Sequence, residues 1–214
     1  GIESVLPLIG NINCALIGEP TEMHPAVAEK GLMVVDAVVH GKSGHAALDE
    51  GENAIYKALP VIEWFRNKRF LKADALSGEV KMTVTMLEAG SQHNVVPCEC
   101  RFSVDVRTNK YYTNEEVFNE IASQCNCEVK ARSFRLRSSF ISMKHPLVDR
   151  ILMLGGKPFV SPTLSDQCLV PFPSLKLGPG SSVRSHIADE FVHVWEIREA
   201  ISIYFKLLNK LSLR

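Results

Sequence analysis

Two adjacent stretches, LMVVDAVV at residues 32–39 and HGKSGHAA at residues 40–47, decide how the middle of the chain folds. The first is rich in β-branched residues and predicts a strand. The second has two glycines within four residues, which predicts a tight turn that ends the strand. This strand and turn begin a block of regular secondary structure that we predict to extend to about residue 141.

After the turn, helical and extended patterns alternate. Apolar residues recur at helical spacing over residues 53–65, where Pro60 is the one awkward member. Thr113 and Glu116 form a capping-box pattern that predicts a second helix to about residue 125. Alternating apolar and polar residues predict three further strands, at 80–87, 98–107 and 128–136. The order strand, helix, strand, strand, helix, strand predicts a ferredoxin-like α/β sandwich with one antiparallel sheet.

The residues on either side of this block follow a different pattern. Apolar runs predict buried strands at 13–18 and 174–177, and helices are predicted at 146–154 and 194–213. In the last helix, a 3.6-residue period joins the apolar residues Ile197, Ala200, Ile201, Tyr204, Phe205, Leu208 and Leu211. We therefore expect an α/β protein of two units, in which residues 34–141 are inserted between residues 1–33 and 142–214 of a larger domain.

Charge and composition exclude several functional classes. Lysine plus arginine equals aspartate plus glutamate at 24 each, so the formal net charge is zero. The basic excess of a nucleic-acid-binding protein is therefore absent. No stretch approaches the ~20 apolar residues of a membrane span, and the first residues do not form a signal-peptide pattern. We expect a cytoplasmic protein that binds neither nucleic acid nor membrane.

The six cysteines include two pairs with a single residue between their members, Cys98/Cys100 and Cys125/Cys127. A chain of this length, with cysteines mostly in predicted strands, is typical of a reducing compartment. Structural zinc sites usually separate their cysteines by two to four residues, which disfavours a zinc knuckle. Alternate residues of a strand share one face, and this explains both pairs more simply.

Two candidate metal-ligating residues lie outside the middle block. Glu19 follows an apolar strand, and the ends of strands in open α/β sheets are where ligands and metals bind. His186 follows a glycine-rich turn and precedes Asp189 and Glu190. Taken alone, Glu19 is more often a turn or cap residue, and His186 is equally well explained as a surface histidine near a helix start.

Three further candidates lie in the middle block. His45 is presented by the glycine-rich turn, which lacks the Gly-x-x-x-x-Gly-Lys spacing of a nucleotide-binding loop. Asn94 lies between two predicted strands, either as a turn residue or as an amide for a polar ligand. Arg107 ends a strand, where its guanidinium suits a substrate carboxylate or a surface ion pair. The sequence contains neither the Gly-x-Ser-x-Gly motif of serine hydrolases nor the His-Glu-x-x-His motif of zincins.

Six short motifs occur along the chain: IGEPT at 17–21, AEKG at 28–31, HGKSGHAA at 40–47, NVVP at 94–97, DVR at 105–107 and SHIADEF at 185–191. In this order they resemble the dinuclear zinc peptidase family that includes acetylornithine deacetylase, succinyl-diaminopimelate desuccinylase and aminoacylase. The resemblance implies a metal-dependent amide hydrolase that removes the acyl group from an N-acyl amino acid. N-acetyl- or N-succinyl-ornithine of arginine biosynthesis is the implied substrate, with a desuccinylase or dipeptidase of the same family as the alternative.

The same resemblance implies roles for individual residues. Glu19 corresponds to the carboxylate ligand of one zinc ion and His186 to the histidine ligand of the other, with cobalt as a substitute metal. His45 matches a lid histidine that crosses the interface of a homodimer and stabilises the tetrahedral oxyanion in the partner's site. Asn94 and Arg107 match lid residues that hold the substrate carboxylate. The middle block would then be the lid and dimerisation domain of this family.

The resemblance is incomplete at the start of the chain. The family's first histidine ligand, bridging aspartate and paired glutamates all precede the Gly-Glu-Pro motif, whereas residues 1–18 contain only Glu3 and neither histidine nor aspartate. We therefore expect this chain alone to bind zinc weakly and to be inactive. The alternative is a non-catalytic dimerisation or binding module of the same descent. The joint presence of His45, Asn94 and Arg107 argues against that alternative.

Overall fold

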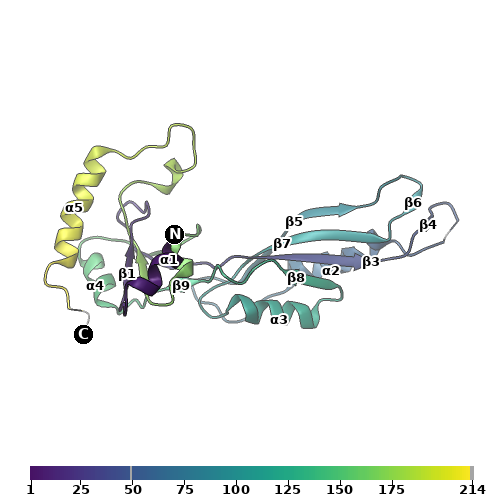
Figure 1. Ribbon diagram of the computed structural model, residues 1–214, viewed down its shortest axis with the longest axis horizontal. Helices are drawn as coiled ribbons and strands as arrows, with labels where there is room; N and C mark the ends of the chain where they lie inside the picture. Colours follow the sequence, from purple (N-terminus) through teal and green to yellow (C-terminus); the bar gives the residue numbers. More distant parts are fainter. Residues whose placement is uncertain (49, 213–214) are drawn as a thin grey trace. The chain divides into compact units, whose positions relative to one another are not determined.

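A computed structural model describes residues 1–48 and 50–212. The chain divides into two compact units, one formed by Gly1–Lys30 and Ser138–Arg214 and the other by Gly31–Arg137 (Figure 1). The sequence placed the two boundaries at 33/34 and 141/142, a few residues later than the structure does. The difference arises because Leu32 already bridges to Leu136 within the second unit. Ser139–Phe140 (β9), in turn, pairs with a strand of the first unit.

The unit Gly31–Arg137, which we call the lid unit, contains a four-stranded antiparallel sheet. The strand order is β5-β7-β3-β8, with bounds Met33–His40 for β3, Lys81–Ala89 for β5, Glu99–Arg107 for β7 and Glu128–Ala131 for β8. Helices α2 (Ala54–Asn67) and α3 (Asn114–Gln124) connect β3 to β5 and β7 to β8. This order and pairing confirm the predicted ferredoxin-like α/β fold.

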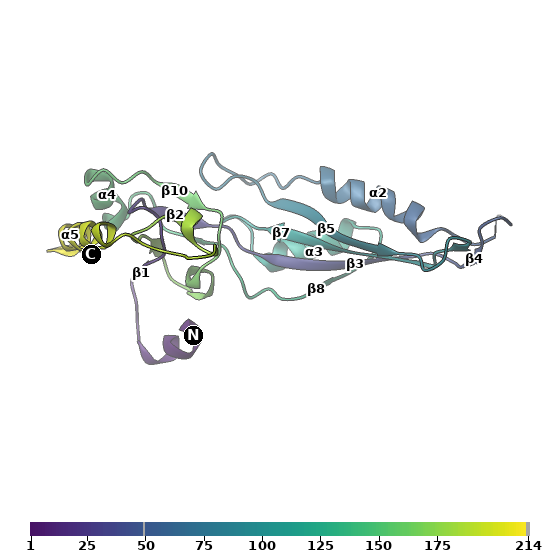
Figure 2. The same ribbon diagram turned by 90° about the horizontal axis from the view of Figure 1, so that it is seen from above.

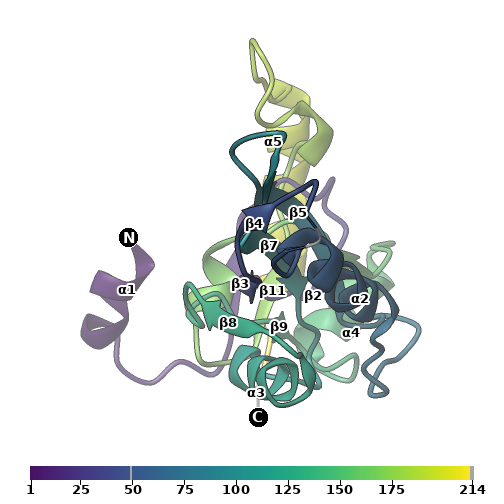
Figure 3. The same ribbon diagram turned by 90° about the vertical axis from the view of Figure 1, so that its right-hand side faces the viewer.

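Both helices of the lid unit cover the same face of its sheet (Figure 3). Alternate residues of β3 and β7, among them Val35 and Val104, point into a core shared with Phe65 of α2 and Ile121 of α3. The opposite face carries polar side chains together with the exposed Met86 of β5. There Asp36 accepts from the Arg132 guanidinium, with 2.8 Å between Nε and Oδ2. The period-2 pattern of the sequence is thus the pattern of burial.

Two short elements extend the lid unit beyond its main sheet. Strand β4 (Gly44–His45) pairs with β6 (Val95–Val96) in a separate two-stranded ladder (Figure 1), and Figure 2 shows β4 beyond the end of the main sheet. At the other side, the predicted strand 128–136 is regular only as far as Ala131. It ends there because the ladder with β3 closes at Arg132, whose N–H donates to Val34, and the chain then turns away.

The other unit, which we call the base unit, contains a mixed sheet. Its order is β1-β11-β2-β10, with β9 also on β2; the bounds are Ala15–Ile17 for β1, Ala26–Glu29 for β2, Phe159–Ser161 for β10 and Ser174–Lys176 for β11. Its helices are α1 (Ile2–Val5), α4 (Pro146–Met153) and α5 (Val194–Leu208), with 3-10 turns η1 (Leu6–Leu8), η2 (Asp166–Leu169) and η3 (Ser182–Arg184). The sequence did not predict β2, whose four residues are all buried and therefore do not alternate.

Helix α5 forms where it was predicted but buries only part of the predicted face. It ends at Leu208, and residue 213, the predicted end, lies outside the described residues. Ala200 of the predicted stripe is buried, as is Leu207, which the stripe did not include, whereas Ile201 and Phe205 of the stripe are 63% and 71% exposed. The helical spacing of apolar residues predicted an apolar stripe on α5, but it did not show which part of the protein packs against that stripe. No helix among the described residues, α5 included, is long and apolar enough to cross a membrane.

Asn114, the first residue of α3, ties this helix to the end of the lid unit. Its Nδ2 donates to the carbonyls of Leu136 at 2.9 Å and Phe134 at 3.1 Å, and its Oδ1 accepts from the Thr108 hydroxyl at 2.8 Å. The side chain is almost fully buried. A sequence pattern identifies it only as the residue after a helix cap.

We predict that Asn114→Ala lowers the free energy of unfolding by about 2–4 kcal/mol, because each buried polar group left without a partner costs about 1–3 kcal/mol. Urea unfolding of the purified chain measures the change. Asn119→Ala, on the exposed side of the same helix, is the matched control. Equal losses for the two variants would show that the buried hydrogen bonds contribute nothing.

Candidate metal and substrate site

Glu19 lies just past the carboxyl end of β1, at the edge where β1 and β11 end together. These strands are parallel, with Ile17 opposite Lys176. The chain after β11 then passes the backbone of Glu19 so closely that a Cβ on Gly178 would be 2.5 Å from the Glu19 carbonyl oxygen. Only glycine permits this approach. Gly178, the first residue of the Gly-Pro-Gly sequence, is therefore a packing requirement of the Glu19 turn.

The turn that follows Glu19 is hydrogen-bonded to the same glycine. The Gly178 N–H donates to the buried Thr21 hydroxyl at 3.1 Å, and the Thr21 N–H donates back to the Gly178 carbonyl at 3.1 Å. Glu22 and Met23 then adopt left-handed backbone conformations, with φ of 54° and 56°. Non-glycine residues rarely do so. The hydrogen bonds to Gly178 thus hold a strained turn at the mouth of the candidate site.

His186 lies in the loop between η3 and α5, also in a left-handed conformation, with φ of 59°. Its backbone N–H donates to Glu190 Oε2 at 3.0 Å. The loop is attached to the start of α5 by an ion pair between Arg184 and Glu196. The Arg184 guanidinium holds the pKa of Glu196 below its usual range. An ion pair and local hydrogen bonds therefore position the histidine.

The two residues predicted as metal ligands line the same hollow. It has a volume of about 310 Å³, and Glu19 and His186 share its walls with Ser161, Thr163 and Lys176. Both predicted ligands are exposed to solvent. Carboxylate and imidazole groups facing one water-accessible space form a donor set that suits zinc.

Beneath this hollow is a buried ion pair that the sequence analysis did not find. Lys176 Nζ lies 2.7 Å from Glu29 Oε2 and donates to Ser161 Oγ at 2.9 Å and the Thr163 carbonyl at 3.0 Å. Glu29 also accepts from the N–H and hydroxyl of Ser165, at 2.9 and 2.8 Å. The pair thereby anchors the wall 161–165. The sequence signal that could have predicted this ion pair was Lys176 in an otherwise apolar strand, together with Glu29 at the end of another apolar run.

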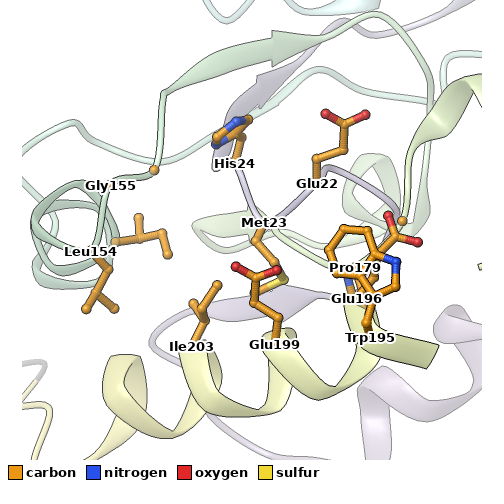
Figure 4. Close-up of a pocket in the computed structure, with 13 residues that line it drawn as sticks. Glu22, Met23, His24, Leu154, Gly155, Pro179, Trp195, Glu196, Glu199 and Ile203 are labelled. Atoms are coloured by element: carbon orange, nitrogen blue, oxygen red, sulfur yellow. The ribbon is translucent and has the colours of Figure 1, made fainter. Parts of the chain in front are cut away.

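A second hollow of about 300 Å³ adjoins the first and shares Glu22 and His24 with it. Figure 4 shows Trp195, Glu199 and Ile203 of α5 facing this space across from the end of α4. None of the five predicted site residues lines it. We therefore assign the candidate site to the first hollow.

In the lid unit, His45 and Asn94 are neighbours. His45 ends β4, and Asn94 is the turn residue directly before β6; the Ala46 N–H donates to the Asn94 carbonyl at 3.0 Å. The Ala47 N–H donates to His45 Nδ1 at 3.2 Å. Since Nδ1 accepts this bond, the proton of the neutral ring is on Nε2. The exposed Nε2–H of His45 is then free to donate to a ligand.

Arg107 does not join His45 and Asn94 within the lid unit. It lies at the end of β7 remote from β6, and the nine residues of β7 span about 27 Å at ~3.4 Å per residue. Its guanidinium is held by Asp105, with Nε–Oδ1 of 2.7 Å and Nη2–Oδ2 of 3.1 Å. The structure therefore contains the ion pair that the sequence left open as an alternative to a substrate contact.

The residues of the first hollow fit part of a zinc site. A zinc ion takes four ligands from side chains, water or substrate, and Glu19 and His186 offer two of suitable type. Among residues 1–48 and 50–212, no cluster of three or more histidine, cysteine, aspartate or glutamate side chains is placed to hold a metal ion. The described residues therefore fit two ligand positions and do not complete a centre.

We predict that Lys176→Met lowers the free energy of unfolding by about 3–5 kcal/mol, because Glu29 is left as an unpaired buried charge. Adding Glu29→Gln to this variant should restore part of the loss. Lys206→Met, at an exposed position of α5, is the control. Chemical unfolding of the four proteins tests this, and a Lys176→Met loss no larger than the control's would contradict it.

Residues 27–132 match the peptidase dimerisation domain of the M20 family. The acetylornithine deacetylase of Myxococcus xanthus is 32% identical over 106 residues, covering 46% of this chain and 28% of that protein. The acetylornithine deacetylase of Photorhabdus laumondii is 27% identical, with 93% of this chain and 57% of that protein covered. A probable carboxypeptidase of Ajellomyces capsulatus is also 27% identical, with 91% and 48% covered.

Solved structures share the fold at low sequence identity. A dinuclear metal-binding peptidase of the M20 family from Bacillus subtilis has a TM-score of 0.66 at 16% identity, with 97% of this chain and 60% of that chain covered. Aminopeptidase PepT of Bacillus cereus has a TM-score of 0.66 at 16% identity, with 91% and 56% covered. This chain spans 28% to 57% of the length of the first curated relatives that it matches. Residues 27–132 thus match a peptidase dimerisation domain, and the chain resembles M20-family peptidases in fold and acetylornithine deacetylases in sequence.

Proposed function

We propose that this chain contributes to a cytoplasmic, zinc-dependent amide hydrolase that removes the acyl group from an N-acyl amino acid, N-acetyl- or N-succinyl-ornithine. The observation that carries the proposal is the placement of Glu19 and His186 on one hollow of the base unit. The named relatives, two acetylornithine deacetylases, support the deacetylase chemistry. A place in arginine biosynthesis is what the resemblance of the sequence motifs implies. One relative is a probable carboxypeptidase, so peptide hydrolysis by an enzyme of the same family is the second candidate activity.

In this proposal each side chain has one task. Glu19 and His186 hold zinc, or cobalt in its place, at the mouth of the hollow. A metal bound there would supply Lewis-acid polarisation of the amide carbonyl and activation of water. His45 donates its Nε2–H to the oxyanion in the site of a partner subunit, a type of contact worth ~10²–10³ in rate. Asn94 of one subunit and Arg107 of the other bind the substrate carboxylate, since the two lie at opposite ends of β7 within one chain, and Arg107 must exchange its contact with Asp105.

The proposal requires further protein to complete the site. The relatives are longer than this chain, and two ligands do not make a dinuclear centre. The exposed stripe on α5, formed by Ile197, Ile201, Phe205 and Leu208, is a surface of the kind that other protein covers. We therefore propose that the remaining ligands and the general base come from protein outside these 214 residues, and that the chain alone is inactive.

One observation favours a second candidate, a non-catalytic binding module. Within the described residues no group of three or more histidine, cysteine, aspartate or glutamate side chains is placed to hold a metal ion. The intact mass of the product isolated from its source cells separates the two. A mass well above 23.8 kDa supports the hydrolase, and a mass of 23.8 kDa supports the module. Zinc-dependent release of acetate from N-acetylornithine by the purified chain would disprove the proposed inactivity.

The metal-ligand roles have a direct test on this chain. We predict weak zinc binding in a calorimetric titration, reduced about tenfold or more by Glu19→Gln or His186→Gln, since each removes a ligand. Glu22→Gln and His24→Gln alter residues of the same types in the same hollow and serve as matched controls. Equal effects at the control positions would refute the assignment of Glu19 and His186.

We also propose that the chain forms a homodimer through the free edge of β5. This edge strand has nine residues, and Met86 and Leu87 on it are 64% and 55% exposed. An exposed apolar edge strand favours pairing with a second copy. The matched dimerisation-domain family supports the same assembly.

We predict that the chain sediments at twice 23.8 kDa and that Leu87→Lys shifts it toward the monomer, because a charge is then buried at the interface. Leu71→Lys is the control, since Leu71 is 93% exposed in a loop of the same unit. Sedimentation velocity over a range of concentrations provides the measurement. An unchanged dimer in Leu87→Lys would place the interface elsewhere.

A further inference from the structure

The Cys125/Cys127 pair has no role in the proposed hydrolase, and its structure differs from the one predicted. The sequence analysis explained it by two alternate residues on one strand face. Instead, Cys125 is the C-cap of α3, with its N–H donating to the Ile121 carbonyl at 2.8 Å. Cys127 lies in the bend before β8, which begins at Glu128. The pair therefore occupies a helix-to-strand bend.

This bend brings the two sulfur atoms close together. Alternate residues of an extended strand have Cα atoms about 6.8 Å apart, which is the upper limit for a disulfide. In the bend the two Sγ atoms are 3.2 Å apart. A disulfide requires about 2.0 Å. Closing it therefore takes an approach of about 1 Å between side chains that already face each other.

The two thiols have different surroundings. Cys125 is buried in the core of the lid unit, whereas Cys127 packs against that core and is partly exposed. The hydrogen bond from the Cys125 thiol holds the pKa of Cys127 below its usual range, and this contact together with burial raises the pKa of Cys125. A thiolate is the nucleophile in disulfide exchange. Cys127 is therefore the accessible attacking thiol and Cys125 the second thiol.

We propose that Cys125 and Cys127 form a reversible dithiol–disulfide site that reacts with low-molecular-weight disulfides such as oxidised glutathione. The Cys127 thiolate attacks one sulfur of the oxidant, which forms a mixed disulfide and releases one glutathione thiolate. Cys125 then loses its proton to solvent and attacks Sγ of Cys127, which releases the second glutathione. The two cysteines are oxidised by two electrons, and one disulfide is reduced to two thiols.

The chain contains a matched control for this site. Cys98 and Cys100 have the same spacing, but they lie where the chain enters β7, and Cys100 is part of its extended ladder. If spacing alone decided reactivity, both pairs would oxidise together. If the bend decides it, only Cys125/Cys127 closes readily.

The test equilibrates the folded 214-residue chain in buffers with increasing ratios of oxidised to reduced glutathione. Free thiols are then alkylated and the protein is digested with trypsin. The masses of peptides 111–130 and 82–101, each of which contains one cysteine pair, are measured by mass spectrometry. We expect peptide 111–130 to lose both alkylation sites, through an internal disulfide, at a ratio at which peptide 82–101 is still a dithiol. Simultaneous oxidation of the two peptides, or persistence of both thiols in 111–130, would overturn the proposal.

Two variants test the order of the steps. In Cys125→Ser the reaction should stop at a glutathione adduct on Cys127, and in Cys127→Ser the buried Cys125 should form none. An adduct on Cys125 in the second variant would contradict the assigned nucleophile. Circular dichroism checks that each variant is folded, and the wild-type titration tests the disulfide without any variant.

Discussion

The contact between Gly178 and the Glu19 turn is the constraint on which the candidate site depends. Parallel pairing of β1 and β11 brings the ends of two strands, far apart in sequence, to one edge. The missing side chain of Gly178 then lets the Glu19 backbone pass within a distance that no Cβ would allow. Thr21 closes the contact with hydrogen bonds in both directions. A carboxylate on one strand and a histidine beyond the other thereby reach one hollow.

Two ion pairs, one fully buried and one nearer the surface, support the walls of that hollow. Lys176 and Glu29 are buried, so their charges are costly to separate and hold the segment 161–165 firmly. Arg184 and Glu196 attach the loop of His186 to the helix start and lie nearer the surface. The sheet side of the hollow is therefore more rigidly determined than the loop side. This difference suits a site in which one wall must admit a ligand.

The lid unit separates its candidate functions along the length of its sheet. His45 and Asn94 share a small ladder beyond one end of β7, and Arg107 lies at the other end, paired with Asp105. Such a separation is consistent with residues that serve different active sites of a homodimer. The polar face of the sheet, where Asp36 meets Arg132, and the core face under the helices follow from simple alternation.

The sequence by itself determined the two helices of the lid unit and the four strands of its main sheet, but not the short strands β4 and β6, because each main strand has one buried face and each helix one apolar stripe. It also determined which side chains were candidates for chemistry, since glycine-rich turns and strand ends are local features. It did not reveal β2, whose buried residues do not alternate, or the face that α5 buries. Only the tertiary structure decided that Glu19 and His186 line one hollow, that Lys176 pairs with Glu29, and that Cys125 faces Cys127 across a bend. These contacts arise from strand pairing, close backbone approach and chain reversal, which local sequence patterns do not specify.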